Sequence, residues 1–313
     1  MPKHLDWRLL HWLGRKPRLL YGAFVAIAFI VSLRLTFPSE AVKERLVYEV
    51  GRQGWQLNWQ AGQGGELGPA GMLGLHATSF ELEDRTGLKI PIDEMTVTLR
   101  PLPLLIGRRV AGIDARAYGG RLKGTVALSG AERPVDLELT DLDLGQAVRL
   151  RQATGLQVKG VARGQVDVVL VADGKHTGQV NLDLAGVDVA GAQVPIPGMG
   201  SGLPLPRLAL GNVTLAAKME NGKATAEKLQ TRGGDAELTA DGAYAVLSPR
   251  IDGVLLNGNV KLKLQDSFWT KPETSSFRGL VENSLPHGPD GTYAFQLSGT
   301  LTHPNLQPAR NPQ

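Results

Sequence analysis

Residues that could carry out chemistry are few in this chain of 313 residues. It contains no cysteine, which excludes a thiol nucleophile and a cysteine-based zinc site. Its six histidines include no pair at the spacing that metal ligands adopt. Ser201 lies in a Gly-Met-Gly-Ser-Gly segment that is flanked by prolines and precedes no predicted helix, so it does not fit the nucleophile turn of a hydrolase. The sequence therefore predicts a chain that is not an enzyme, with no catalytic residue, no metal site and no cofactor.

A repeated alternation of aliphatic and polar residues is the dominant pattern instead. Between Val135 and Leu144, nearly every second residue is aliphatic and the residues between them are polar. Because successive side chains of a β-strand point to opposite faces, such a segment has one apolar face and one polar face. The same pattern recurs further along the chain. The residues predicted to form a shared hydrophobic face are Val135, Leu137, Leu139, Val180, Leu182, Leu184, Val260, Leu262 and Leu264.

Turn signals separate the alternating segments at short intervals. Asn-Gly, Asp-Gly and similar pairs between such segments predict antiparallel hairpins in chain order. The fold class that follows is an all-β domain with an elongated, twisted antiparallel sheet. The predicted turns are Gly119-Gly120, Ser129-Gly130, Asp173-Gly174, Asn221-Gly222, Asp241-Gly242, Asn257-Gly258 and Asp290-Gly291.

Two arrangements of such a sheet are compatible with the pattern. If the aliphatic faces of the strands meet, they form a closed β-sandwich whose surface and edges bind protein partners. If one long sheet curls instead, its aliphatic face lines an open groove that could shield acyl chains from water. The whole chain has only 17 aromatic residues to fill a wide interior, which leans slightly towards the groove or a thin core.

The net charge of the chain is concentrated at its N-terminus. Residues 1–18 contain five basic residues and one acidic residue, whereas the rest of the chain contains 29 of each, so the net charge of +4 lies in this tail. The apolar run that follows, residues 19–37, is long enough at about 1.5 Å per residue to span a hydrocarbon core of about 30 Å. The positive flank is expected to stay in the cytoplasm, which places the remainder in a bacterial periplasm. The balanced charge of that remainder argues against nucleic acid as a partner.

The segment after the apolar run predicts a short helix. Ser39 can cap it, Glu40 lies in its first turn, and aliphatic residues then mark one side. An alternative is a cleaved signal peptide, because Ser39 and Ala41 have the small side chains of a cleavage site. The predicted organisation is a cytoplasmic basic tail (1–18), a transmembrane anchor in the inner membrane (19–37), a juxtamembrane amphipathic helix and linker (38–60) and a periplasmic β domain (61–313).

An insertion at residues 266–290 breaks the strand rhythm. It brings Trp269 and Phe277 into an otherwise aliphatic part of the chain. Because functional contacts concentrate in loops, these two aromatic residues are the candidate partner contact.

Two motifs resemble those of a known family. They are Tyr-Gly-Gly-Arg-Leu-Lys-Gly at residues 118–124 and Gly-Thr-Leu-Thr-His-Pro at residues 299–304. These motifs come after a basic tail, one predicted anchor and a predicted amphipathic helix. In this order of elements, residues 19–308 resemble the type II secretion system protein N family. They are also similar to motifs of AsmA-like envelope proteins. The residues that carry the resemblance are Tyr118, Gly119, Gly120, Leu122, Gly124, Gly299, Leu301 and Pro304.

The first resemblance implies a non-enzymatic accessory or scaffold of type II protein secretion, anchored in the inner membrane by a single pass. Its partners would be other secretion-system subunits. The similarity to AsmA-like proteins implies the alternative, a periplasmic lipid-binding or lipid-transfer protein whose hydrophobic groove takes phospholipid acyl chains.

Overall fold

The computed structural model describes residues 21–309 apart from 23, 26–27, 30, 33–35, 53, 60–64, 72, 85–88, 147–156, 192, 195–202, 205, 249–252, 276–277 and 301–303. The predicted cytoplasmic tail, residues 1–18, lies outside the described residues, as does part of the predicted anchor, residues 19–37. The described residues between Tyr21 and Ser32 are helical. Within the described part of the chain, no helix has both the length and the apolar character that crossing a bilayer requires.

The described chain is mostly β-strand, with short helices before and between the strands. The helices are α3 (Ser39–Arg52), α4 (Pro101–Leu105), η1 (Leu144–Gln146), α6 (Asp266–Trp269), α7 (Pro272–Ser275) and α8 (Arg278–Ser284). The strands are β1 (Trp55–Trp59), β2 (Leu67–Ala70), β3 (Gly74–Asp84), β4 (Lys89–Leu99), β5 (Val110–Ala117), β6 (Gly120–Ala127), β7 (Glu132–Asp143), β8 (Gln157–Val171), β9 (Thr177–Ala190), β10 (Gln193–Val194), β11 (Leu203–Pro204), β12 (Leu208–Glu220), β13 (Lys223–Arg232), β14 (Ala236–Val246), β15 (Leu255–Leu264), β16 (Thr292–Gly299) and β17 (Pro304–Pro308).

All but two of these strands form one antiparallel sheet. In the described residues this sheet has 15 strands in the order β1-β3-β4-β5-β6-β7-β8-β9-β12-β13-β14-β15-β16-β17, with β2 paired to β3. The remaining strands, β10 and β11, pair with each other. Neighbours in space are therefore mostly neighbours in sequence, as the turn signals predict, and the all-β prediction is confirmed. The strands do not divide into the two facing sheets of a sandwich.

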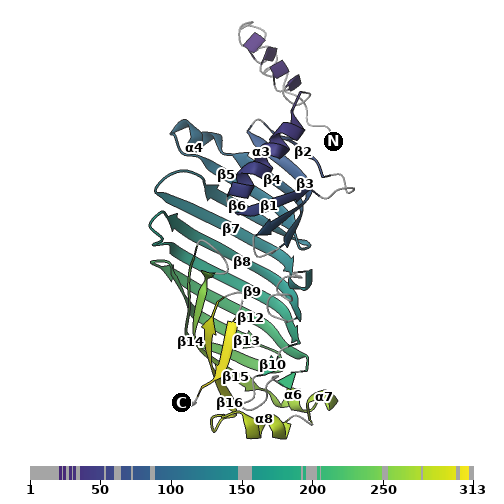
Figure 1. The fold of residues 1–313 in the computed structure, drawn as a ribbon, viewed down its shortest axis with the longest axis vertical. Coiled ribbons are helices and arrows are strands. Elements are labelled where there is room, and N and C mark those ends of the chain that lie inside the picture. Colours follow the sequence, from purple (N-terminus) through teal and green to yellow (C-terminus); the bar gives the residue numbers. More distant parts are fainter. Residues whose placement is uncertain are drawn as a thin grey trace, which may run out of the picture.

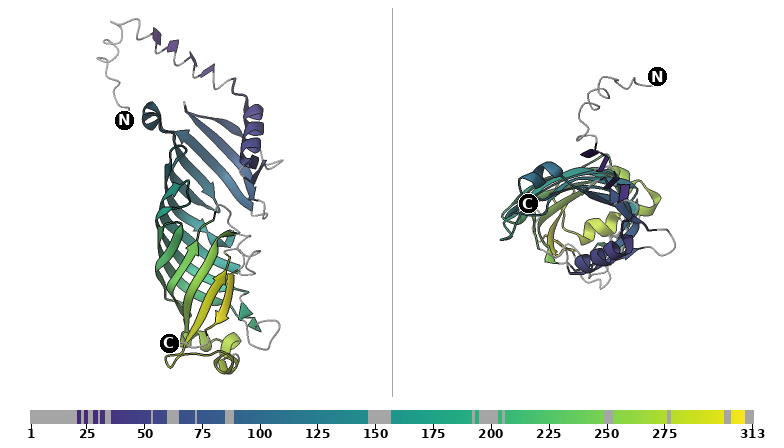
Figure 2. Two further views of the ribbon diagram at one scale, coloured as in Figure 1. Left: turned by 60° about the vertical axis from the view of Figure 1, so that its left-hand side comes forward. Right: turned by 90° about the horizontal axis from the view of Figure 1, so that it is seen from above.

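The sheet is long, twisted and curled (Figure 1). Viewed from above in Figure 2, the strands lie around a ring, and Figure 1 shows α8 at one end of this ring, next to β16. Helices α6 and α8 pack through Phe268 and Val281 against Leu262, Tyr293 and neighbouring apolar residues of the sheet. The face that carries these apolar residues is therefore the concave face, and the polar face is convex.

Irregular strand pairing explains part of this curl. The register shifts within β7 between Leu139 and Leu142, within β8 next to Gly160, and within β12 on both sides of Gly211. These positions follow one another across neighbouring strands, because the β8 and β12 irregularities both face the same segment of β9. An extra residue bends a strand and increases its right-handed twist. A line of such bulges bends the whole sheet in one direction.

Glycines on the concave face allow neighbouring strands to approach closely. A Cβ atom at Gly124 would lie 1.9 Å from the carbonyl oxygen of Asp136, and one at Gly164 would lie 2.2 Å from that of Asn181. Real Cβ atoms do not approach backbone oxygens at such distances, so any larger residue at either position would force the strands apart. These two glycines therefore permit the tight curvature of β6 to β9.

Replacing Gly164 with valine is expected to destabilise the sheet by about 2 kcal/mol or more, because the new side chain would overlap both Asn181 and the Leu182 side chain. The midpoint of thermal unfolding, followed by circular dichroism, measures this effect. Gly68→Ala is the matched control, because a Cβ atom there meets nothing within 4 Å. Equal melting of the two variants would contradict a role for Gly164 in curvature.

The predicted turns are only partly correct. The pairs at Gly119, Gly130, Gly174 and Gly222 lie in loops between adjacent strands. Two others are wrong: Asp241-Gly242 lies within β14 and Asn257-Gly258 lies within β15. The remaining pair, Asp290-Gly291, precedes β16 and follows the helices.

The two wrong turns have a common physical reason. The pairing of β14 with β15 shifts between Asp241 and Tyr244, and this shift places Ala243 against Gly258. A Cβ atom at Gly258 would lie 2.3 Å from the Cα atom of Ala243. The glycine there serves close packing within the sheet rather than a reversal of the chain.

The predicted juxtamembrane helix is present as α3 and packs against one end of the sheet. Its residues Leu46 and Val50 contact a cluster formed by Leu57, Phe80 and Ile92. The strand β1 lies in the segment predicted as a linker. The alternation of Trp55, Leu57 and Trp59 is too short to predict a strand from the sequence. In the structure, this segment is a strand because it pairs with β3.

Candidate functional site

The residues predicted to share a hydrophobic face do lie on one face of the sheet. Leu137 of β7 pairs with Val166 of β8, which in turn pairs with Val180 of β9. In the next row, Leu139 and Leu182 flank Gly164. The structure thus brings the β7 and β9 residues together with a single strand between them. Leu184 continues this face on β9, next to Ala162 and Val213, and Val135 continues it on β7, next to Val126 and Val168.

The sequence prediction missed the contribution of β8. This strand supplies Ala162, Val166 and Val168 to the face, and Ala162 and Val168 are buried. Two inward positions of β8 are alanine and glycine, which weakens the aliphatic alternation that identifies a strand face. The only remaining sign of an apolar face on β8 in the sequence was a few valines at even spacing, which are Val158, Val166 and Val168.

The face continues on both sides of this centre. On β6, Leu122 pairs with Leu139 and Gly124 pairs with Leu137. On β12, Leu215 pairs with Leu182. Rows of aliphatic side chains and glycines therefore run across β6, β7, β8, β9 and β12. The positions in these rows carry no charged side chain.

The convex face of the same strands is polar. In one row Glu138 pairs with Gln165, which pairs with the exposed Asn181. Cross-strand ion pairs lie on this face, including Arg163 Nε to Asp141 Oδ1 at 2.6 Å. The sheet therefore keeps its solvated side on the outside of the curl, and the charged residues are excluded from the inside.

The Asp114 and Arg121 pair shows how strongly these convex charges interact. The Arg121 Nε atom donates a hydrogen bond of 2.7 Å to Asp114 Oδ1. This hydrogen bond from the guanidinium lowers the pKa of Asp114 below its usual value and raises the pKa of Arg121. Both groups therefore stay ionised at neutral pH, and they link β5 to β6 on the outside.

Helices cover the concave face at its two ends. At one end α3 covers the cluster of Leu57, Phe80 and Ile92. At the other end α6 and α8 cover β14 to β16 through Phe268, Val281 and their neighbours. We call α6, α7 and α8 together with their packed side chains the helical cap.

A buried acidic residue attaches the cap to the sheet. The Asp235 carboxylate accepts a hydrogen bond of 3.0 Å from the backbone amide of Ala209 and forms an ion pair with Lys271, which lies between α6 and α7. The backbone oxygen of Asp235 accepts a hydrogen bond of 2.8 Å from the Gln265 amide. One loop residue thus connects β12, β15 and the cap.

Between the two ends, the concave face has no covering element among the described residues. The principal contacts of β7, β8 and β9 are with neighbouring strands and with η1. Leu137, Val166 and Leu182 belong to neither hydrophobic cluster, and they are half-buried. We call this middle region, on β6 to β9 and β12, the open apolar face; it is the candidate functional site.

The β15 residues have a different environment from those of β7 and β9. Val260 pairs with Phe295, and Leu262 pairs with Tyr293. Leu262 and Leu264 pack against the buried cluster of the helical cap. Burial raises the pKa of Tyr293. The predicted face is therefore continuous, but Leu262 and Leu264 on β15 pack against the core of the cap, whereas the middle part of the face is open.

The predicted partner contact falls on the helical cap. Trp269 is 9% exposed, and its ring meets that of Phe268 edge-on at 4.9 Å between centroids. The insertion at 266–290 thus folds into three short helices whose described aromatic residues face the sheet, which leaves the Trp269 indole little surface for a partner. Phe277 lies outside the described residues.

The family-like residues have structural positions in two hairpins. Tyr118 and Gly119 form the turn between β5 and β6 with φ of 52° and 70°, and the Tyr118 hydroxyl donates to the Lys89 carbonyl oxygen at 3.3 Å. Gly120 packs against the backbone of Asp141. Gly299 pairs with Pro304 where β16 meets β17, and Leu301 lies outside the described residues.

The titratable residues of the described part form no recognisable reaction centre. His76 bonds Thr96 through Nδ1 at 3.0 Å, and His176 Nδ1 accepts the Val171 amide proton at 3.1 Å. In the described residues no three metal-ligating side chains lie close together.

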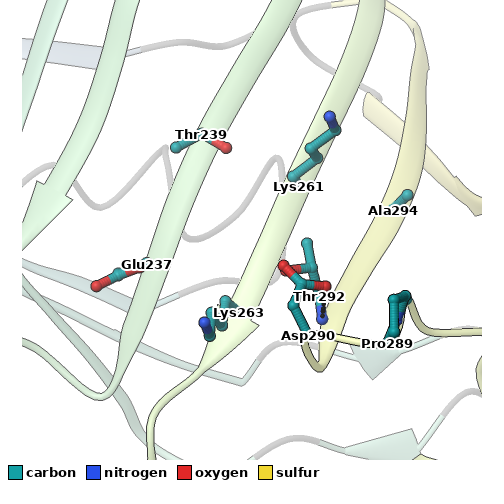
Figure 3. A pocket seen from close by; sticks show the side chains of 9 residues that line it. Glu237, Thr239, Lys261, Lys263, Pro289, Asp290, Thr292 and Ala294 are labelled. Atoms are coloured by element: carbon teal, nitrogen blue, oxygen red, sulfur yellow. Dashed lines mark hydrogen bonds between the residues drawn. The ribbon is translucent and has the colours of Figure 1, made fainter. Parts of the chain in front are cut away.

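A depression of about 500 Å³ lies on the polar face near the cap (Figure 3). Its walls come from alternate residues of β14, β15 and β16 and from the loop before β16, and Asp290 there accepts a 2.7 Å hydrogen bond from the Thr292 hydroxyl. Lysine ammonium groups and carboxylates share it without a nucleophile and base in hydrogen-bond contact. The lining residues are Glu237, Thr239, Lys261, Lys263, Gly288, Pro289, Asp290, Thr292 and Ala294.

No protein-family model matches this chain, and neither a curated protein nor a solved structure is significantly similar to it.

Proposed function

We propose that this protein is a non-enzymatic, lipid-binding component of the bacterial envelope that holds acyl chains on its open apolar face. The observation that carries the proposal is a concave aliphatic surface, bounded by α3 at one end and the helical cap at the other, with no described element packed over its middle. A folded domain rarely leaves a contiguous apolar face without an occupant.

The energetics favour a flexible hydrocarbon as the occupant. Burial of apolar surface contributes roughly 25 cal/mol per Å², or about 0.8 kcal/mol for each methylene group. Leu137, Val166 and Leu182 present methyl groups and no polar atom, so they can recognise a chain only by its lack of polarity. Such a surface binds acyl chains of different lengths without specifying the head group.

The dimensions of the face also fit an acyl chain. Neighbouring strands are about 4.8 Å apart, so the distance from β6 to β12 along the sheet is about 19 Å. One leaflet of a bilayer is about 15 Å thick, which is half of the hydrocarbon core. A phospholipid chain therefore fits across these strands in an extended form.

The proposed location is the inner membrane, with the sheet in the periplasm. It is supported by the basic residues 1–18, the apolar run at 19–37 and the position of α3, which begins at Ser39 and packs directly on β1. An anchor at residues 19–37 would hold this end of the sheet close to the bilayer from which a lipid could be taken.

A second candidate is the accessory or scaffold of type II secretion that the motifs at 118–124 and 299–304 imply. The sheet edges favour it. Among the described strands, β17 pairs only with β16 and β1 pairs only with β3, so each leaves one edge of backbone groups available for a partner strand. The two functions are compatible in one protein, but they predict different bound molecules.

Site-specific photocrosslinking in the full-length protein separates the candidates. A benzoylphenylalanine at Leu182, on the open apolar face, is expected to form an adduct with phospholipid in bacterial membranes. The same probe at Asn181, which is exposed on the convex face, is the control and is expected to give none. Mass spectrometry identifies the adduct. Phospholipid adducts at neither position, together with lipid-free purified protein, would overturn the lipid proposal and leave the secretion candidate.

A further inference from the structure

The connection between β4 and β5 exposes an unusual set of large hydrophobic side chains. Leu102 is 77% exposed, Leu105 is 82% exposed and Ile106 is 72% exposed, and these are the highest values for large hydrophobic residues among the described residues that follow α3. A single exposed leucine is ordinary, but three such side chains on one short turn mark an interaction surface.

This turn has a defined conformation. Proline occupies positions 101 and 103 of α4. The backbone amides of Ile106 and Arg108 donate to the Pro103 carbonyl oxygen at 3.1 and 2.9 Å. The Arg100 amide donates to the Val110 carbonyl oxygen at 2.8 Å and closes the turn on the end of the hairpin. The backbone of the turn is therefore already ordered before any partner binds. Binding through its exposed hydrophobic side chains would not lose conformational entropy by ordering the turn.

The charges that flank the turn in the sequence have a single sign. Arg100, Arg108 and Arg109 flank it and all three are exposed. No acidic residue lies between positions 100 and 109. A hydrophobic tip flanked by arginines is complementary to a bilayer surface, where phosphate groups lie above a hydrocarbon layer. A protein partner would have to offer an apolar pocket and an acidic rim at once.

The position of the turn agrees with a membrane contact. In Figures 1 and 2, α4 lies at the same end of the molecule as α3. Helix α3 starts at Ser39, two residues after the end of the predicted anchor at residues 19–37. The turn and α3 are therefore at one end of the sheet, and the helical cap is at the other.

We propose that the α4 turn inserts Leu102, Leu105 and Ile106 into the surface of a bilayer containing anionic phospholipid, with the three arginines at the phosphate groups. This inference rests on the proposed membrane anchor at residues 19–37, but not on the proposed binding of acyl chains, because it concerns a different surface of the protein. It adds a second point of attachment to the membrane and fixes the tilt of the sheet against it.

The absence of cysteine from the chain makes the test direct. Full-length Leu105→Cys protein, labelled with an environment-sensitive fluorophore, is reconstituted into vesicles of phosphatidylcholine and phosphatidylglycerol at a 7:3 ratio. The emission is expected to shift to shorter wavelength and to be quenched by lipids that carry a nitroxide on the acyl chain. Leu306→Cys, on the last strand of the sheet and 44% exposed, is the matched control and is expected to show neither change.

The arginines are tested in the same labelled protein. Changing Arg108 and Arg109 to glutamine is expected to reduce quenching at least about threefold in the 7:3 vesicles and to have little effect in pure phosphatidylcholine. Emission at Leu105→Cys that matches the control would overturn the proposal. A shift to shorter wavelength without quenching by the lipid nitroxide would also overturn it, because that result indicates contact between two copies of the protein.

Discussion

Replacing Leu137 with aspartate is expected to lower the phospholipid bound per protein at least about tenfold while the protein remains folded. Leu137 is half-buried on the open apolar face and belongs to neither of the two hydrophobic clusters. In the absence of lipid, a carboxylate at this position can remain hydrated. When an acyl chain lies over it, the charge must lose its water without gaining a partner, which is costly.

The same substitution at Leu262 is expected to have the opposite outcome. Leu262 packs against the buried cluster of the helical cap, so an aspartate there would lie in a packed core, and the loss of stability is expected to be about 3–4 kcal/mol. Asn181→Asp adds the same charge on the exposed convex face and is the control for charge alone. Thermal unfolding and bound lipid phosphorus are measured for all three variants. If Leu137→Asp melts as early as Leu262→Asp, the middle of the concave face is a core and the proposed binding surface does not exist.

Replacing Phe268 with alanine is expected to destabilise the protein by about 3–5 kcal/mol, the range typical of a large buried aromatic residue. Phe268 is 1% exposed and contacts Trp269 edge-on in the centre of the helical cap. Truncation would leave a cavity that the short helices α6 and α7 cannot fill, because the buried Thr274 hydroxyl and the Asp235 carboxylate fix their positions.

Chemical denaturation measures the effect on stability. The control is Ser267→Ala, because Ser267 neighbours Phe268 but is exposed, and it is expected to change stability by less than about 0.5 kcal/mol. Near-ultraviolet circular dichroism reports the packing of Trp269 separately from the strands. A Phe268→Ala protein with wild-type stability would show that the cap is a peripheral feature and not the closure of one end of the sheet.

If both proposals hold, the open apolar face and the α4 turn make different contacts with lipid. The open apolar face is recessed on the inside of the curl and suits a single chain removed from a bilayer. The α4 turn projects at one end and suits the bilayer itself. A variant of the turn should therefore alter how the protein sits on the membrane, whereas a variant such as Leu137→Asp should alter what it carries.

Much of the local structure was predictable from the sequence because it depends on local physics. The alternation around Leu137 and Leu182 specifies a strand with one apolar face, whatever surrounds it. The Asn221-Gly222 pair, with φ of 51° and 75°, specifies a tight hairpin because few other residues adopt such angles. Ser39 and the aliphatic residues after it specify α3. The all-β class, most of the hairpins and the β7 and β9 members of the hydrophobic face therefore follow from residue types and spacing, whereas the β8 members and the two glycine pairs within β14 and β15 do not.

The location of the open part of that face was decided only by tertiary structure. Leu137 and Leu262 have the same sequence pattern, yet only Leu262 is covered, because the insertion at 266–290 folds back over β15 and not over β7. The curl itself depends on bulges next to Gly160 and Gly211 and on the close approach at Gly164, which involve pairs of strands that the sequence does not place in register. Alternation determines which side chains share a face; long-range packing determines whether that face meets protein or remains open.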